Sequence, residues 1–314
     1  MRKMIFAGLL ALAPFIALAE YPERLTRIVS PFSAGGGLDI VARVIGPKLS
    51  EIYKQPVIVD NRTGANGQIA IEYVAKAAPD GYTLLIDTLG FTVHPAVTRT
   101  LPFDPNAIEP VAQLLTLPFI VVVNPRVPAK NVAELISLAR RNPGKLNFAQ
   151  GGLSNRILGE MLRLQTNVEF NFVPYKGSNP TTMAVIAGES DLTITDSATA
   201  AQHIAAGKLR ALAVTSAKRS ALLADVPTVA ESGVPEYAIT VWYGIFATPG
   251  TPPAVVRRLN TELNKIVMMP DVTARFATLG AEPAPTTPEA FGATVKSQMA
   301  IMKDVAARAK IPLE

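Results

Sequence analysis

The chain has 314 residues, 49% of them hydrophobic and 18% charged, and it carries a net charge of +5 at neutral pH. This composition describes a well-packed globular protein and excludes a disordered chain. The absence of cysteine excludes disulfides and an anchor on a lipidated cysteine, and the scattered basic residues include no run of the kind that binds nucleic acid.

The start of the chain has the pattern of an export signal. A basic pair precedes an apolar run that ends in Ala17-Leu18-Ala19, the small-x-small pattern of a cleavage site. The alternative is a membrane anchor, but the run is shorter than the about 20 apolar residues that span a bilayer, and it contains Pro14. We therefore predict a secretory signal peptide over residues 1–19, cleavage after Ala19 and export to the periplasm.

Strands and helices alternate through the next part of the chain. Apolar runs predict strands and helically spaced apolar residues predict helices, in the order strand 25–32, helix 40–52, strand 56–59, helix 67–77 and strand 82–87. This βαβαβ order is typical of a doubly wound parallel sheet. A β-branched strand over residues 119–123 follows, and Asn124-Pro125 ends it.

A second alternation of the same kind fills the middle of the chain. We predict helices over residues 132–141, 157–164, 180–187 and 198–206, and strands over residues 145–149, 172–175, 191–195 and 209–215. A strand over 239–247 and helices over 253–268, 272–279 and 288–309 follow. With hinges near Asn124 and Pro235, these elements predict an α/β fold with residues 20–123 and 239–314 in one lobe and residues 124–238 in a second.

The first candidate binding loop is Pro31–Asp39, between a predicted strand and a predicted helix. Its three consecutive glycines let a ligand approach the backbone closely, and the helix start favours an anion. A dinucleotide fingerprint fails because Ile40 stands where the third glycine is needed, and no Gly-Lys-Ser/Thr follows to make a P-loop. The alternative is a tight turn in which Asp39 caps the helix.

Four more glycine-rich or polar loops follow predicted strands, where ligands bind in parallel sheets. They are Asn61–Gly67, Gln150–Arg156, Tyr175–Pro180 and Thr195–Ser197. Each can also be a plain cap and turn, with Asn66 or Ser154 as an N-cap.

The sequence gives little support for a catalytic or metal-binding site. A nucleophile elbow around Ser154 would need a glycine two positions later, where the chain has arginine. His94 and His203 are interpreted as packing or surface residues, Trp242 and Tyr243 as core or rim residues, and no His/Asp/Glu grouping has the spacing of a metal site. The sequence therefore predicts a binding protein without metal or cofactor, not an enzyme.

The chain resembles the Bug, or TctC-like, family of periplasmic solute-binding receptors that serve tripartite tricarboxylate transporters. The resemblance covers nearly the whole chain after residue 19 and is carried by Pro31–Asp39, Asn61–Gly67, Ala78–Leu85, Val173–Gly177, Gly207–Thr215, Asp225–Glu231 and Trp242–Gly244. It implies a type II periplasmic-binding-protein fold, with two doubly wound lobes, a hinge and a ligand cleft between them. It also implies that a ligand carboxylate is held largely by backbone groups and ordered water.

By position, the resemblance assigns ligand binding to residues of these loops. They are Phe32, Ser33, Gly35, Gly36, Gly37, Asp39, Gly64, Ala65, Gly67, Thr88, Leu89, Gly90, Gly151, Ser154, Asn155, Arg156, Lys176, Gly177 and Asp196.

Two loops depart from the family pattern. The first has Gly-Gly-Gly-Leu-Asp where members commonly carry Gly-Gly-Pro-x-Asp or Gly-Gly-x-x-Asp, and Arg156 stands where the third loop usually has histidine. A guanidinium can pair bidentately with a carboxylate, so we predict that the ligand is an aliphatic or aromatic dicarboxylate. The alternative is that Arg156 lies on the outer helix face in solvent.

We expect a monomeric receptor that captures a small organic acid by lobe closure and delivers it to the membrane subunits of a tripartite transporter. A ligand sensor that signals to a membrane kinase is an alternative with the same ligand chemistry and a different partner. A periplasmic hydrolase is a further alternative, against which the missing catalytic motifs argue.

Overall fold

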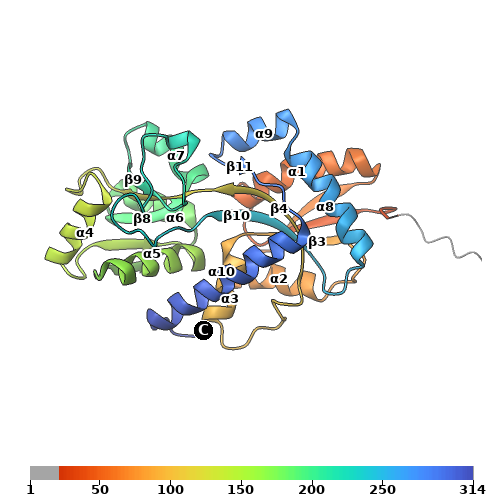
Figure 1. Cartoon of the computed structure of the whole chain (residues 1–314), viewed down its shortest axis with the longest axis horizontal. Coiled ribbons are helices and arrows are strands. Elements are labelled where there is room, and N and C mark those ends of the chain that lie inside the picture. The colour runs from red at the N-terminus through yellow and green to blue at the C-terminus, as the bar shows by residue number, and fades with distance from the viewer. Residues whose placement is uncertain (1–20, 314) are drawn as a thin grey trace, which may run out of the picture.

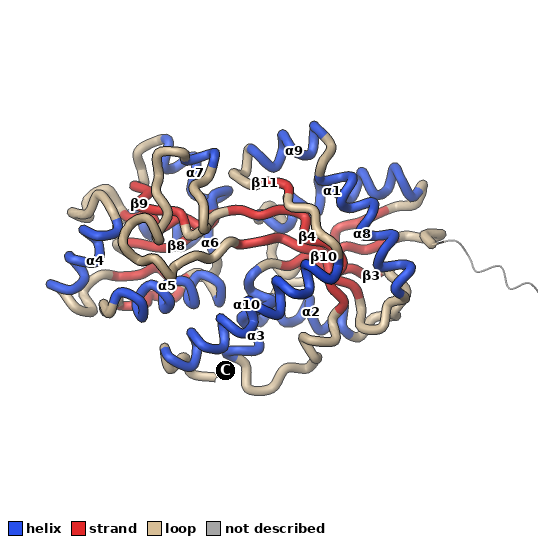
Figure 2. The backbone as a smooth tube through the Cα atoms, viewed as in Figure 1, coloured by secondary structure: helices blue, strands red, loops and turns tan. Residues whose placement is uncertain are grey.

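The computed structural model describes residues 21–313 (Figure 1). The predicted signal peptide over residues 1–19 and its cleavage site after Ala19 lie outside these residues. Two sheets lie along the long axis of the molecule, and helices cover both (Figure 2). Within residues 21–313, no helix is both long and apolar enough to cross a membrane.

The first sheet has six strands in the order β11-β4-β10-β3-β1-β2. These strands are β1 (Thr26–Ser30), β2 (Val57–Asn61), β3 (Thr83–Asp87), β4 (Glu109–Leu117), β10 (Val241–Ala247) and β11 (Glu282–Pro283). β1, β2 and β3 are parallel, as the βαβαβ pattern predicts, but β10 runs antiparallel between β3 and β4. The lobe therefore combines a doubly wound half with an antiparallel half.

Seven helical segments pack on this sheet or continue its strands. They are α1 (Gly37–Tyr53), the 3-10 turn η1 (Ala65–Gly67), α2 (Gln68–Ala75), α3 (Leu89–Val97), α8 (Pro253–Val267), α9 (Pro270–Ala277) and α10 (Pro288–Arg308). In α1, Val41, Ile45 and Leu49 recur at helical spacing and are fully buried, which is the face that the periodicity predicts.

The second sheet has five strands in the order β7-β6-β8-β5-β9. Its strands are β5 (Phe119–Val123), β6 (Asn147–Gln150), β7 (Asn171–Pro174), β8 (Leu192–Asp196) and β9 (Arg210–Val214). Its helices are α4 (Val132–Arg141), α5 (Leu153–Thr166), α6 (Ser178–Ala187), α7 (Ser197–Ala205) and the 3-10 turn η2 (Ala221–Leu223). β6, β7 and β8 are parallel, and β5 is antiparallel to both of its neighbours.

The chain crosses between the sheets twice, and the predicted hinges are displaced. β4 ends at Leu117 and β5 begins at Phe119, so the first crossing is at Pro118 and not near Asn124. Proline has no N–H to donate to a ladder, so one sheet ends there and the next begins. The backbone N–H of Ile239 still donates to the carbonyl oxygen of Thr215, the residue directly after β9 of the second sheet, at 2.8 Å, so the return is at Thr240, beyond Pro235.

The crossings define the two lobes. The first lobe contains residues 21–117 and 241–313, and the second contains residues 119–239. The predicted assignment of residues 119–123 to the first lobe is wrong, because these residues pair with β8 and β9 in the second sheet. An all-apolar strand carries no signal of the sheet to which it belongs, so the pattern alone could not place it.

Candidate functional site

The strand directions bring the candidate loops to one place. β10 enters from the crossing and runs antiparallel to β3, with Gly244 opposite Asp87, so β1, β2 and β3 end at the edge that faces the second lobe. In the second sheet Phe119, at the start of β5, lies opposite Asp196, the last residue of β8. The parallel strands β6, β7 and β8 therefore end at the edge that faces the first lobe.

Helices begin at six of these strand ends. The N-caps are Gly36 of α1, Gly67 of α2, Thr88 of α3, Gly152 of α5, Gly177 of α6 and Asp196 of α7. A helix N-terminus presents unpaired N–H groups and the positive end of the helix dipole. Helix starts that face one another across the lobes therefore favour an anion between them.

The first binding loop is shaped by Asp39, which is buried three residues after the N-cap of α1. Its carboxylate accepts hydrogen bonds from the Gly35 N–H and the Arg43 guanidinium, both at 2.9 Å, and from the Asn61 amide at 3.0 Å. Burial raises the pKa of Asp39, but these hydrogen bonds outweigh it and hold the pKa below its ordinary value. Asp39 is therefore ionised and occupied in holding the first and second loops together, and it is not the N-cap.

The third loop repeats this arrangement in the second lobe. Asn155 accepts a hydrogen bond from the Gly151 N–H at 2.9 Å, four residues earlier, as Asp39 does from Gly35. The Asn155 amide donates to the hydroxyl of Thr193 at 2.9 Å and to the backbone of β8. Asn155 is buried, so its polar atoms shape the loop.

Close neighbouring atoms require glycine at two of the predicted positions. A Cβ at Gly37 would lie 2.5 Å from the hydroxyl oxygen of Tyr243, and a Cβ at Gly151 would lie 2.6 Å from the carbonyl oxygen of Gly177. Burial and the nearby charge of Asp196 both raise the pKa of Tyr243. Tyr243 is thus a neutral hydroxyl group between the first loop of one lobe and Asp196 of the other.

Tyr243 is a neighbour of the candidate loops that sequence reasoning placed in the core or rim. It is almost fully buried, as that interpretation requires, but it lies next to the loops of both lobes. The useful signal is its place in the chain, since it is the third residue of a strand that enters directly from the crossing.

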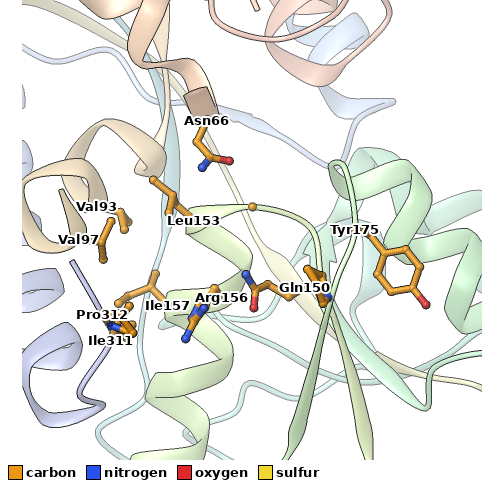
Figure 3. Close-up of a pocket in the computed structure, with 12 residues that line it drawn as sticks. Asn66, Val93, Val97, Gln150, Leu153, Arg156, Ile157, Tyr175, Ile311 and Pro312 are labelled. Carbon is orange, nitrogen blue, oxygen red and sulfur yellow. The ribbon is translucent and has the colours of Figure 1, made fainter. Parts of the chain in front are cut away.

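A cavity of about 180 Å³ lies between the lobes and is lined by both (Figure 3). Its lining residues are Asn66, Val93, Val97, Gln150, Gly152, Leu153, Arg156, Ile157, Pro174, Tyr175, Ile311 and Pro312. Arg156 is the one predicted site residue among them, although Asn66, Gln150, Gly152 and Tyr175 come from the predicted loops. Sequence reasoning missed the walls from α3 and from the end of the chain.

The structure places Arg156 at this cavity beside Gln150 and Ile157, and its side chain is 30% exposed (Figure 3). One guanidinium nitrogen is 3.9 Å from the carboxylate of Glu160, which pairs more closely with Arg163 at 2.6 Å. The Arg156 Nε is buried and has no hydrogen-bond partner in residues 21–313. The guanidinium therefore keeps hydrogen-bonding capacity beside the cavity.

The remaining predicted residues range from buried through partly buried to exposed. Thr88 is buried, and its hydroxyl has no hydrogen-bond partner among the described residues. A Cβ on Gly90 would lie 3.5 Å from the Ser154 hydroxyl, so the starts of α3 and α5 meet across the lobes. The exposed predicted residues, which do not line the cavity, are Phe32, Ser33, Gly35, Gly64, Ala65 and Lys176.

His94 packs inside the first lobe and supports the second loop. Its Nε2 is 3.2 Å from the carbonyl oxygen of Asn66, and burial lowers the pKa of His94 despite this hydrogen bond. The neutral ring therefore donates from Nε2 and fixes Asn66, which has a left-handed φ of 55° and lines the cavity. Among residues 21–313, no group of three or more His, Asp or Glu side chains is arranged to hold a metal ion.

Two lobes joined by two crossings, with helix starts facing one another and a cavity lined from both sides, define a two-lobed binding protein. The chain matches the model of the tripartite tricarboxylate transporter family receptor over residues 41–307. It belongs to this family of periplasmic receptors, as the motifs in its loops imply.

Similar proteins support the same assignment along nearly the whole chain. A protein encoded in the tcbD–tcbE intergenic region of Pseudomonas sp. strain P51 is 39% identical over 306 residues, which cover 95% of this chain and 91% of the relative. A structure of an R. palustris protein with adipate is 36% identical, with a TM-score of 0.86, and covers 94% of this chain and all of that one. MatC from Rhodopseudomonas palustris with bound malate is 29% identical, with a TM-score of 0.83 and coverage of 91% and 99%.

Proposed function

We propose that this receptor captures a small dicarboxylic acid between its lobes and delivers it to the membrane subunits of a tripartite tricarboxylate transporter. The observation that carries the proposal is the position of Arg156, whose guanidinium lies at a cavity lined by both lobes. The structural neighbours with adipate and malate support it, because both of these ligands are dicarboxylates.

In this proposal the two carboxylates of the ligand meet different groups. One lies at the helix starts that follow Gly36, Thr88 and Gly152, where backbone N–H groups face the space between the lobes. Each helix start contributes roughly 0.3–2 kcal/mol. The second carboxylate pairs with Arg156, and a hydrogen bond to a charged group adds about 1.5–3 kcal/mol.

Lobe closure follows from the division of these groups between the lobes. α1 and α3 begin in the first lobe and α5 begins in the second. A ligand that bonds both lobes binds the closed form more tightly and shifts the population toward it. The two short crossings at Pro118 and Thr240 are the segments whose backbone angles would change.

The other parts of the proposal concern where and how the receptor acts. It acts in the periplasm after removal of residues 1–19, as a monomer, without cofactor and without catalysis. The polar groups of the loops support binding rather than bond-breaking, because Asp39 and Asn155 are occupied in holding loop backbone.

Titration calorimetry with residues 20–314 tests the proposal directly. We expect Arg156→Ala to weaken dicarboxylate binding roughly 10- to 100-fold, the equivalent of one lost charge-assisted hydrogen bond. The affinity for monocarboxylates should fall much less in this variant. Arg275→Ala, an exposed arginine of α9, is the matched control for the change in net charge. Unchanged dicarboxylate affinity in Arg156→Ala would contradict the role of this arginine.

A further inference from the structure

The end of the chain reaches from the first lobe to the second. α10 begins on the first sheet, packs along α3 and contacts α5 of the second lobe. Figure 1 shows α10, in dark blue, running toward α5. The residues that follow, Lys310–Leu313, form the segment that we call the C-terminal tail. Two of them, Ile311 and Pro312, line the interlobe cavity.

A defined helix-ending motif directs the tail to this place. Ala309 is the C-cap of α10, and Lys310 has a left-handed φ of 54°. The Lys310 N–H donates to the Ala307 carbonyl at 3.1 Å, and the Ile311 N–H donates to the Ala306 carbonyl at 3.0 Å. This pair of hydrogen bonds is the Schellman motif, which reverses the chain at a helix end. The tail is therefore held by backbone hydrogen bonds as well as by packing.

The tail gives the cavity an apolar side. Ile311 is partly buried and packs against the main hydrophobic core. Figure 3 shows Ile311 and Pro312 on the same side of the cavity as Val97 and Ile157, with Arg156 next to them. The polar lining residues Asn66 and Gln150 come from the strand-end loops. The cavity thus has an apolar wall that ends at a guanidinium.

We propose that Ile311 and Pro312 are specificity-determining residues that contact the apolar spacer of a bound dicarboxylate. This inference rests on the proposed function and narrows its ligand class to dicarboxylates with an unsubstituted aliphatic or aromatic spacer. Each methylene buried against the wall strengthens binding by about fourfold. A hydroxyl on the spacer would face apolar side chains without a hydrogen-bond partner, so hydroxylated acids of equal charge bind less tightly.

Calorimetry with a series of unbranched dicarboxylates from succinate to suberate, and with malate, tests whether the tail contacts the ligand spacer. We expect Ile311→Ala to weaken the best-binding acid of the series by about 10- to 60-fold, because roughly three methylene-sized groups are removed and each one that contacts the spacer contributes about fourfold. Malate affinity should change less than twofold. Ile311→Phe should move the optimum of the series to shorter acids. Leu313→Ala is the control, since Leu313 is 51% exposed and does not line the cavity.

Different failures of this experiment have different meanings. An unchanged rank order of affinities for the acids in both Ile311 variants would contradict the proposed contact between Ile311 and the ligand spacer. An equal loss for every acid, malate included, would also overturn it, because the tail would then act on lobe closure alone. Wild-type protein that binds none of the acids would overturn the proposed function itself. Thermal unfolding of each variant, with Ile311→Val as the conservative change, separates a loss of contact from a loss of fold.

Discussion

At the scale of single residues, Gly37 and Tyr243 form a contact that tolerates no side chain. A Cβ at Gly37 would lie 2.5 Å from the Tyr243 hydroxyl oxygen but 3.3 Å from the ring carbon that bears it. We expect Gly37→Ala to destabilise the protein by about 1–3 kcal/mol through overpacking.

The double variant tests the physical reason for this cost. Tyr243→Phe removes the hydroxyl and should recover most of the stability that Gly37→Ala loses, as measured by urea unfolding of the two single variants and the double variant. An identical cost of Gly37→Ala in both backgrounds would show that the hydroxyl is not the obstacle.

Asp87 is a buried carboxyl group whose protonation is tied to stability. Burial raises its pKa to about 7, and the hydrogen bond from the Thr88 N–H offsets only part of this effect. The stability supplied by the neutral form is complete below the ordinary pKa of 3.8 and is lost as the pH rises toward 7. Between pH 5 and pH 7 the titration of Asp87 alone should lower the free energy of unfolding by on the order of 2–3 kcal/mol.

Asp87→Asn should remove this pH dependence, because asparagine does not titrate. The fold should be kept, because the asparagine oxygen can still accept from the Thr88 N–H. The measurement is the free energy of urea unfolding at several pH values between 5 and 8 for the wild type and the variant. Two parallel curves would mean that Asp87 does not stay protonated in the folded protein.

At the scale of elements, the predictions succeed where hydrophobic periodicity is strong or where turn residues bound an apolar run, as for β5, and they miss two elements. The amphipathic helices α4 and α8 were predictable from their spacing. α3 and β4 were not, because most residues of each are buried and neither alternates between apolar and polar positions. The cavity wall formed by Val93 and Val97 was therefore also hidden.

Helix starts were predicted in the right loops but at the wrong residues. Asn66 and Ser154 were plausible N-caps, but the structure begins α2 and α5 after Gly67 and Gly152. These glycines have φ values of 101° and 135°, which side-chain-bearing residues rarely adopt. The tight path of the backbone around the site thus outweighs the side-chain capping preference on which the prediction depended.

Asp196 is the N-cap of α7. Substitutions at this position can separate the effect of its capping hydrogen bonds from the effect of its charge. Its carboxylate accepts from the N–H and the hydroxyl of Thr199, both at 2.8 Å. Asp196→Ala should destabilise the protein by about 1 kcal/mol through loss of the cap, whereas Asp196→Asn should change its stability by about 0.5 kcal/mol or less. Urea unfolding compares them, and equal losses would rule out capping as the role of this side chain.

At the scale of the whole molecule, the sequence predicted two lobes but not where they join. Phe119–Val123 and Val241–Ala247 are both fully buried apolar strands, and each continues almost directly from the other lobe. Their sheet membership depends on partners that are distant in the chain, such as Asp196 opposite Phe119. Local pattern contains no information about such partners.

The contribution of the C-terminal tail to the cavity was also not predictable from local sequence pattern. Ile311 and Pro312 are close in sequence to the end of the chain and far from every predicted loop, yet they share a cavity with Arg156. Only the length of α10 and the Schellman motif at its end bring them there.

A thermal-shift screen of mono-, di- and tricarboxylates with residues 20–314 tests most directly whether the cavity between the lobes binds an organic acid. A ligand present at 100 times its Kd adds about 2.7 kcal/mol of stability, which for a protein of this size raises Tm by roughly 4–5 °C. We expect such a rise with one or more dicarboxylates and a smaller rise with the same acids in Arg156→Ala. A Tm that no carboxylate raises would contradict organic-acid capture by this receptor.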